Sequence, residues 1–395
     1  MLVVWRSVHG VQSGNGPGPG RLSLDSGRAV GMCTVAIVGL GTIGSAVASL
    51  VARMPQISAV TLVDHDAYDE SNLTTQAIDA SALGRPKVKV QASIIQAINP
   101  KLEVKAVEEY IENVPLGLMR GSILVSCVDN RRARQSVNRI SWRCGSSWID
   151  AAIGTASLVR ISVYTPSCEA PCLECGWDER SYELLEQEYP CTVGGGSVPA
   201  TGAPAELGAL AASLQIAELR KLVSDEYDGG SLVGAQLMFD TTTHEKHLGL
   251  FQRNEKCRFD HEIWEIEPVD LDPRKHTLLD LFESTEASAD PAVNLSIEED
   301  SFATYLDCVA CGRRSNIDLS LYGRLSVDAR TCGCGGRMFA TGFFSFESIR
   351  RDELSSSKLD TKLCSLGFRA GDVISVAHAS GSVRHLEIGK RQIND

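Results

Sequence analysis

A glycine-rich turn between two apolar segments constrains the fold more than any other part of this sequence. Residues 34–40 form an apolar, β-branched run that is typical of a strand buried on both faces. The run leads into the motif GLGTIG at residues 39–44, and an alanine-rich helical pattern follows. A second apolar strand ends at Asp64, which lies 20 positions after Gly44. This order indicates a nucleotide-binding site, because glycines let backbone amides approach a phosphate and a helix N-terminus attracts negative charge.

Strand and helix patterns alternate through the first half of the chain. After Asp64 we expect a helix over 86–98, a strand over 102–107, a buried strand ending at Asp129, a helix over 131–143, strands near 148–152 and 158–164, and a long helix over about 205–223. Alternating strands and helices predict an α/β fold with a Rossmann-like, mainly parallel sheet and helices on both faces.

Polar residues that suit a triphosphate follow the second strand. They are Asp64, His65 and Asp66, then Asn72 and Gln76, then Arg85 and Lys87. Asp129 ends a parallel strand and therefore points into the crevice where such sheets bind ligands, as a natural ligand for Mg²⁺. A dehydrogenase has no need of this set, whereas an enzyme that activates a carboxylate with ATP does. Taken singly, Asp66 also suits a loop cap and Asn72 a turn.

Together these motifs resemble the ThiF/MoeB/HesA family and the related adenylation domains of ubiquitin-activating enzymes. The resemblance covers 34–261 and is carried by GLGTIG, VDHD, SNLTTQ, GRPK, VDNRRARQSVN, PCLEC and RNEKC. It implies an adenylyltransferase that uses ATP and Mg²⁺ to activate the C-terminal carboxylate of a ubiquitin-like or sulfur-carrier protein, releasing pyrophosphate. The binding residues that it implies are Gly39, Gly41, Gly44, Asp64, Asp66, Asn72, Gln76, Lys87 and Asp129, of which Lys87 and Asp129 are also catalytic candidates.

The sequence departs from the family at one position of the N-L-x-R-Q motif. Thr75 stands where the family usually has an arginine, and threonine cannot offer a fork of charged donors to a phosphate. Arg85, a further catalytic candidate, or Arg131 can supply the charge. A neighbouring subunit can also supply it through Arg21 or Arg28, which favours a homodimer or a related partner subunit. The alternatives are an impaired, scaffolding homologue or, on the glycine turn and ribose acid alone, an NAD(P)-dependent oxidoreductase.

The resemblance also implies a zinc site. Cys172 and Cys175 form a C-x-x-C where the family often has one zinc pair, and Cys257 lies where the second pair is expected. Strict spacing would place the fourth ligand at Asp260. We favour His261, because tetrahedral zinc accepts three thiolates and an imidazole; the alternative is a plain surface histidine. Four protein ligands leave no open position, so this zinc is expected to be structural.

Four further cysteines form a second cluster. Cys308 and Cys311 form a C-x-x-C, and Cys332 and Cys334 form a C-x-C about twenty residues later. Four cysteines at these intervals, flanked by glycines, predict a zinc ribbon, with a redox-active disulfide as the alternative. Such a ribbon is expected to dock a partner or to staple a subdomain too small to fold alone.

Cys191 is a candidate nucleophile. It lies in the segment EYPCTVGGGSVPATG, between the first cysteine pair and the long helix. Its position resembles that of the catalytic cysteine of ubiquitin-activating enzymes, which implies attack on the acyl-adenylate to form a thioester. No basic neighbour in the sequence lowers its pKa, so an inert cysteine is the alternative.

Composition and the properties of individual segments limit the possible partners, cellular location and domain organisation. The net charge of −12 argues against nucleic-acid binding, and no apolar run is long enough for a transmembrane helix. Paired cysteines without a signal-peptide pattern favour a cytoplasmic protein. The predicted parts are a flexible lead over 1–32, an adenylation domain over 33–264, an acidic linker over 265–300, a zinc-ribbon-like unit over 301–345 and a small β-rich tail over 346–395. By analogy with ubiquitin-activating enzymes, the tail suggests recruitment of a conjugating enzyme; a sulfurtransferase is the other downstream partner considered.

Overall fold

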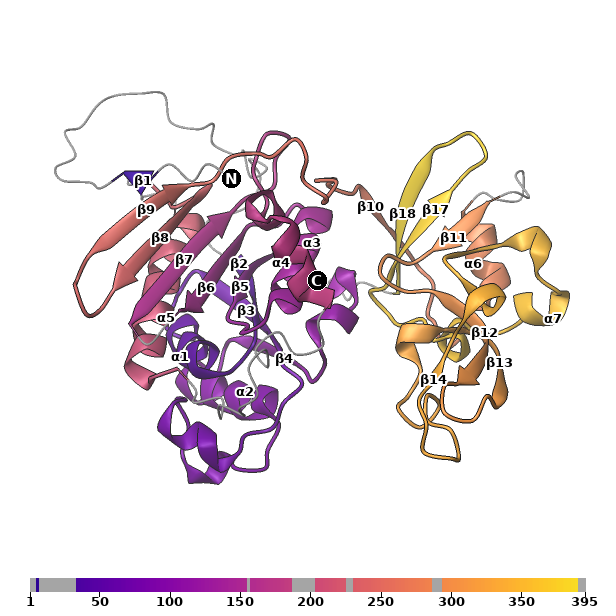
Figure 1. Ribbon diagram of the computed structural model, residues 1–395, viewed down its shortest axis with the longest axis horizontal. Helices are drawn as coiled ribbons and strands as arrows, with labels where there is room; N and C mark the ends of the chain where they lie inside the picture. The colour runs from indigo at the N-terminus through magenta and orange to yellow at the C-terminus, as the bar shows by residue number, and fades with distance from the viewer. Residues whose placement is uncertain are drawn as a thin grey trace. The chain divides into compact units, whose positions relative to one another are not determined.

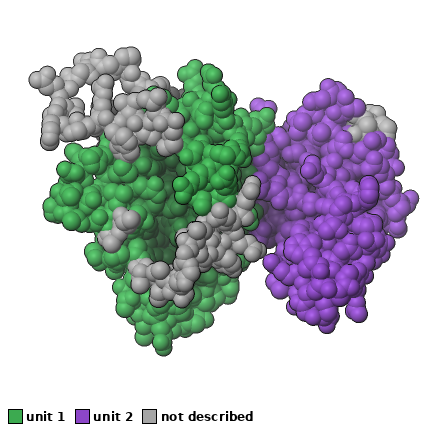
Figure 2. All heavy atoms as spheres, viewed as in Figure 1, with its two compact units in different colours: residues 1–112, 121–263 green, residues 113–120, 264–395 purple. Residues whose placement is uncertain are grey.

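The computed structural model describes residues 5–6, 33–154, 157–186, 203–224, 230–285 and 293–389. The chain divides into unit 1, residues 1–112 and 121–263, and unit 2, residues 113–120 and 264–395 (Figure 2). In these described ranges, no helix combines the length and the apolar character needed to cross a membrane.

A nine-stranded mixed sheet forms the centre of unit 1 (Figure 1). Its order is β1 (Trp5–Arg6), β9 (Lys246–Leu250), β8 (Ala235–Asp240), β7 (Leu158–Tyr164), β6 (Trp148–Ile153), β5 (Ser122–Ser126), β2 (Cys33–Val38), β3 (Ile57–Val63) and β4 (Glu103–Val107). The strands from β6 to β4 pair in parallel, which confirms the predicted α/β sheet for this part. From β6 outward through β7, β8, β9 and β1 the pairing is antiparallel. The strands β8 and β9 were not expected from the sequence.

Helices cover both faces of this sheet. Helix α1 (Thr42–Val51) packs against both α2 (Lys87–Ile98) and α5 (Ala205–Val223), and α3 (Arg131–Cys144) lies on the opposite face (Figure 1). A shorter helix, α4 (Glu179–Glu186), follows the first cysteine pair. The apolar runs read from the sequence fill the core, since Val35 and Ile37 of β2 are fully buried, as is Val47 of α1.

Unit 2 contains two smaller sheets. One has the order β10 (Ile266–Val269), β18 (Val383–Ile388), β17 (Val373–Ala377), β11 (Asn294–Ser296) and β16 (Ser348–Arg350). The other contains β13 (Arg314–Leu321), β12 (Phe302–Cys308), β14 (Met338–Phe339) and β15 (Ser345–Phe346). Two helices, α6 (Leu278–Ser284) and α7 (Ser356–Leu359), complete the described part of the unit.

The prediction of an acidic linker over 265–300 is wrong. The segment supplies β10, α6 and β11, and the last strand pairs with β17 and β16. Leu278, Leu281 and Phe282 of α6 are fully buried, while Thr277 and Asp280 form a capping box at its N-terminus. The acidic residues therefore cap or flank an apolar helix instead of keeping the segment in solvent.

The predicted β-rich tail is likewise part of a larger sheet. Its strands β17 and β18 pair in an antiparallel hairpin, but β18 also pairs with β10 and β17 with β11. The segment 113–120, which connects β4 to β5 in the sequence, also belongs to unit 2: the Gly117 amide donates to the Gly371 carbonyl at 2.8 Å, and Arg120 pairs with Glu387.

Candidate functional site

The glycine turn after β2 is shaped by close backbone contacts. Gly39 has a φ of +86°, and its amide donates to the Val63 carbonyl at 2.9 Å. A Cβ at Gly44 would lie 1.9 Å from the Gly39 carbonyl oxygen, whereas a Cβ at Gly41 would meet nothing within 4 Å. Gly41 is the N-cap of α1, so the open side of the turn faces a helix N-terminus that suits an anion.

Replacing Gly44 with alanine is expected to destabilise unit 1, because the new methyl group collides with the turn itself. We expect a loss of about 1–3 kcal/mol in the free energy of unfolding, the usual range for overpacking a tight site. Thermal and denaturant unfolding measure the change. Gly41→Ala is the matched control and is expected to lose less stability, because its methyl group meets no atom within 4 Å and only the N-cap preference for glycine is lost. Equal loss in both variants would contradict the steric argument.

Asp64 ties the end of β3 to the glycine turn. Its Oδ2 accepts from the Leu40 amide at 2.6 Å, and its Oδ1 accepts from the Asp66 amide at 2.8 Å. The side chain is largely buried at this position. Each carboxylate oxygen retains a lone pair, so Asp64 can still accept a hydrogen bond from a ribose hydroxyl.

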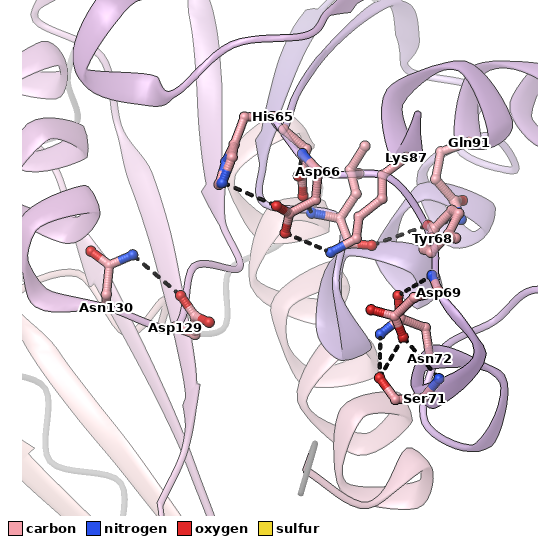
Figure 3. A network of polar contacts seen from close by, with 12 residues as sticks. His65, Asp66, Tyr68, Asp69, Ser71, Asn72, Lys87, Gln91, Asp129 and Asn130 are labelled. Atoms are coloured by element: carbon pink, nitrogen blue, oxygen red, sulfur yellow. Dashed lines mark hydrogen bonds and ion pairs between the residues drawn. The ribbon is translucent and has the colours of Figure 1, made fainter. Parts of the chain in front are cut away.

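Asp66 forms an ion pair with Lys87 (Figure 3). The Lys87 Nζ donates to Asp66 Oδ2 at 2.9 Å, and His65 Nε2 lies 3.0 Å from Asp66 Oδ1. Lys87 begins α2, and its side chain is only 10% exposed, whereas that of Asp66 is half-exposed. This arrangement fixes the lysine head group beside the carboxyl end of β3, so Asp66 does more than cap a loop.

Tyr68 and Gln91 join the loop to the glycine turn, and sequence reasoning missed both. The Tyr68 hydroxyl donates to the Leu40 carbonyl at 3.1 Å and accepts from Gln91 Nε2 at 2.8 Å. Burial raises the pKa of the Tyr68 hydroxyl well above its ordinary value, so it stays a neutral donor. A tyrosine five residues after the end of a buried strand is a weak sequence signal, because its hydrogen-bond partners come from two distant segments.

The N-L-x-R-Q region forms a short 3₁₀ helix over Glu70–Thr74. The Asn72 Oδ1 accepts from the Asp69 amide at 3.1 Å, so this side chain forms a capping box, as the turn alternative predicted. The Gln76 Oε1 is buried and has no hydrogen-bond partner among the described residues. Thr75 is half-buried, and Arg85 is exposed. The structure therefore leaves Gln76, more than Asn72, with an unused polar atom.

Asp129 lies beyond the carboxyl end of β5, next to the N-terminus of α3. It is exposed and accepts from Asn130 Nδ2 at 3.2 Å, and Asn130 caps α3 through the Ala133 amide (Figure 3). Arg131 follows, with its guanidinium 6.0 Å from the Trp177 ring. Because β2 lies between β3 and β5, the Lys87 pair, the glycine turn and Asp129 follow the carboxyl ends of adjacent parallel strands.

A buried polar network supports the loop that carries Asp129. Arg134 Nε lies 3.2 and 3.1 Å from the two carboxylate oxygens of Asp150, and its Nη2 donates to the Val128 carbonyl at 2.6 Å. Ser126 Oγ also donates to Asp150 at 2.8 Å. The sequence placed Arg134 in a motif but gave no sign of Asp150, because this pairing joins β6 to α3.

The first cysteine cluster comes together in unit 1. Cys172 Sγ lies 3.7 Å from Cys257 Sγ, and Cys175 Sγ lies 3.2 Å from His261 Nε2. Zinc–sulfur bonds of about 2.3 Å in a tetrahedron separate sulfurs by about 3.8 Å, so this donor set fits zinc. Asp260, the ligand that strict spacing suggested, instead makes two 2.7 Å contacts with Arg143.

The second cluster comes together in unit 2. Cys308 and Cys334 sulfurs lie 3.6 Å apart, and those of Cys311 and Cys332 lie 3.7 Å apart. All four are free thiols, so the structure does not contain the disulfide considered as an alternative. The chemistry and spacing of these donors also fit a tetrahedral zinc ion.

Several predicted residues lie outside the described ranges, namely Arg21, Arg28 and Cys191. Among the described cysteines, Cys127 is the one that follows β5, and burial raises the pKa of its thiol far above its ordinary value. Cys127 is therefore a core residue and not a nucleophile.

Unit 1 is similar in sequence to proteins of known function. The sequence pattern of the ThiF family matches residues 22–259. Molybdopterin-synthase adenylyltransferase from Escherichia coli (strain K12) is 26% identical over 239 residues, which cover 59% of this chain and 89% of that protein. Ubiquitin-like modifier-activating enzyme 5 from Branchiostoma floridae is 27% identical over 191 residues, which cover 42% of this chain and 45% of that enzyme. The crystal structure of E. coli MccB with ATP aligns with a TM-score of 0.47 and 22% identity, covering 57% of this chain and 66% of that chain.

Proposed function

Because the chain belongs to the ThiF family, whose enzymes use ATP with Mg²⁺ to adenylate a carboxylate, we propose that it adenylates the C-terminal carboxylate of a ubiquitin-like or sulfur-carrier protein. One observation carries the proposal: the Asp66–Lys87 pair, the glycine turn and Asp129 follow three neighbouring parallel strands. This is where open α/β sheets bind nucleotides.

Each residue has a distinct task in the proposed reaction. Backbone amides of the turn hold phosphate oxygens, and Asp64 binds the ribose. Asp129 would hold Mg²⁺, which would neutralise negative charge at the phosphates. Lys87 leaves Asp66 for the phosphate oxygens as negative charge develops. A carboxylate oxygen then attacks the α-phosphorus, an oxygen–phosphorus bond forms, the bond to the β-phosphate breaks, and pyrophosphate leaves.

The charge that the missing arginine would supply needs another source. Arg85 and Arg131 are the candidates within the described chain, since one is exposed in the loop before α2 and the other begins α3 beside Asp129. An arginine of a second subunit is the remaining source, and Arg21 or Arg28 of another copy would provide it.

We propose further that Cys191 accepts the activated acyl group as a thioester and that the product passes to a conjugating enzyme or sulfurtransferase.

The cysteine clusters have a structural role in this proposal. Cys172, Cys175, Cys257 and His261 would hold one Zn²⁺, and Cys308, Cys311, Cys332 and Cys334 would hold another. Each set supplies four donors, which leaves no open position for catalysis.

Exchange of labelled pyrophosphate into ATP tests the proposal. We expect the wild type to catalyse exchange only with Mg²⁺ and a carrier protein ending in glycine. Asp129→Ala is expected to raise the Mg²⁺ concentration for half-maximal exchange about tenfold, the effect of losing about 1.4 kcal/mol of binding free energy. An exchange rate at background with every carrier, despite ATP binding, would contradict adenylation by this chain alone.

Thr75 favours a second candidate function, a scaffold that binds a carrier protein without turnover. Adding a related partner subunit separates the two functions, because a partner that supplies an arginine restores exchange and a scaffold stays inactive. The oxidoreductase considered from the sequence is not retained, since the glycine turn and Asp64 that favoured it are equally features of an ATP-binding ThiF site.

A further inference from the structure

Arg160 lies at the carboxyl edge of the sheet, next to the proposed site. Val38, Ser126 and Asp150 are register partners across β2, β5 and β6, so they mark one row of the sheet. Arg160 of β7 pairs with Ala152, two residues beyond Asp150 toward the carboxyl end of β6. Arg160 therefore lies toward the carboxyl ends of β2, β5 and β6, where the glycine turn and Asp129 also lie.

Arg160 is half-buried, and its Nε is fully buried without a hydrogen-bonding partner in the part of the chain that the structure describes. Burial lowers the pKa of its guanidinium below the ordinary value, although arginine keeps its charge in proteins. Asp150 attracts it, but that carboxylate is already bound by Arg134 and Ser126. A buried donor of a charged group costs free energy when it has no acceptor, so the unpaired Nε points to an anion that binds there.

The surrounding charges also favour an anion. Arg131 and Arg134 both repel Arg160 electrostatically, so three guanidinium groups share the neighbourhood of one buried carboxylate, Asp150. In the sequence, Arg160 lies inside an apolar strand pattern, where an arginine looks like an edge residue. Its significance comes from the strand order, which brings β7 next to β6.

The order of the strands indicates which anion binds Arg160. In the proposed reaction the nucleotide occupies the ends of β3, β2 and β5, through Asp64, the glycine turn and Asp129. Arg160 lies on β7, two strand positions beyond β5, or about 10 Å across the sheet. The attacking carboxylate must approach the α-phosphorus from the side opposite the departing pyrophosphate, and β6 and β7 form the next part of the same edge.

We propose that Arg160 binds the carboxylate of the acyl substrate and orients it for attack on the α-phosphate. The inference rests on the proposed adenylation. One carboxylate oxygen accepts hydrogen bonds from the guanidinium, and the other forms the new bond to phosphorus as pyrophosphate leaves with the electron pair of the broken bond. No proton transfer is needed, because the carboxylate is ionised at neutral pH.

Binding of a synthetic peptide that ends in Gly-Gly tests the assignment. The full-length protein is loaded with Mg²⁺ and a non-hydrolysable ATP analogue, and the peptide is added with either a free C-terminal carboxylate or a C-terminal amide. We expect the wild type to prefer the free acid about ten- to hundredfold, the effect of hydrogen bonds to a charged group. Arg160→Gln should lose this preference, and Arg160→Lys should keep part of it.

Two controls accompany this measurement. The affinity for the ATP analogue should be the same in the wild type and Arg160→Gln, and Arg220→Gln, an exposed arginine on α5, should behave as the wild type throughout. If Arg160→Gln retains the preference for the free acid, or the wild type has none, the assignment is overturned. If Arg160→Gln has a lower melting temperature but the same peptide binding as the wild type, Arg160 is structural and the assignment is overturned. A wild type that does not bind the ATP analogue contradicts the proposed function instead.

Discussion

Replacing Lys87 with methionine is expected to lower the rate of ATP–pyrophosphate exchange about a hundred- to thousandfold, the effect of removing one group that stabilises charge in a transition state. Lys87 is the one described lysine of α2 whose side chain is nearly buried, and its Nζ lies 2.9 Å from Asp66 Oδ2. Methionine keeps the length and packing of the side chain but offers no charge to the phosphates.

The fold should tolerate this change, which makes the activity loss interpretable. Asp66 is half-exposed, so water can solvate its carboxylate when the lysine is absent. Lys89→Met, on the same helix, is the matched control because Lys89 is exposed and pairs with Glu108 at 3.2 Å. Exchange and thermal unfolding are measured for both variants. Equal activity in Lys87→Met and Lys89→Met would remove Lys87 from the mechanism.

Local sequence patterns predicted the glycine turn and the elements on either side of it well. The run 34–38, the glycine turn and Asp64 are contiguous elements whose contacts are short in sequence: β2 ends at Val38, and α1 begins at Thr42. Backbone requirements at Gly39 and Gly44 are visible in the sequence because few other residues satisfy them.

Contacts between distant segments were the part that the sequence did not reveal. Asp150 can bind Ser126 and Arg134 only because β6 pairs with β5 and lies under Arg134. In the sequence, the residues around Asp150 have the pattern of an ordinary apolar strand. The error over 265–300 had a different cause, because acidic residues and prolines outweighed a helical pattern that was present. Leu278, Leu281 and Phe282 have the spacing of one helix face, and this signal could have identified α6.

Chelation of the zinc ion proposed for the first cluster is the second change for which we expect a large effect. The four donors join the segment at Cys172 to the segment at Cys257, and Trp142 of α3 packs on them. Structural zinc sites in small peptides bind with about 10–16 kcal/mol of apparent free energy, so metal loss should weaken this part of unit 1 strongly. Since about 2–4 °C are lost per kcal/mol in a domain of this size, we expect chelation to lower the melting temperature by about 10 °C or more.

Two neighbouring substitutions test which residue is the fourth ligand. The wild type should contain two zinc ions per chain, one for each cluster, and His261→Asn should retain only the second. Asp260→Asn is the matched control: Asp260 contacts Arg143 and not the sulfurs, so the variant should keep both ions even if it unfolds at a lower temperature. Metal analysis of the purified variants measures the stoichiometry, which separates a ligand from a residue that only stabilises the fold. Loss of one ion in Asp260→Asn together with full zinc content in His261→Asn would assign the fourth position to the aspartate, as the strict spacing of the motif suggests.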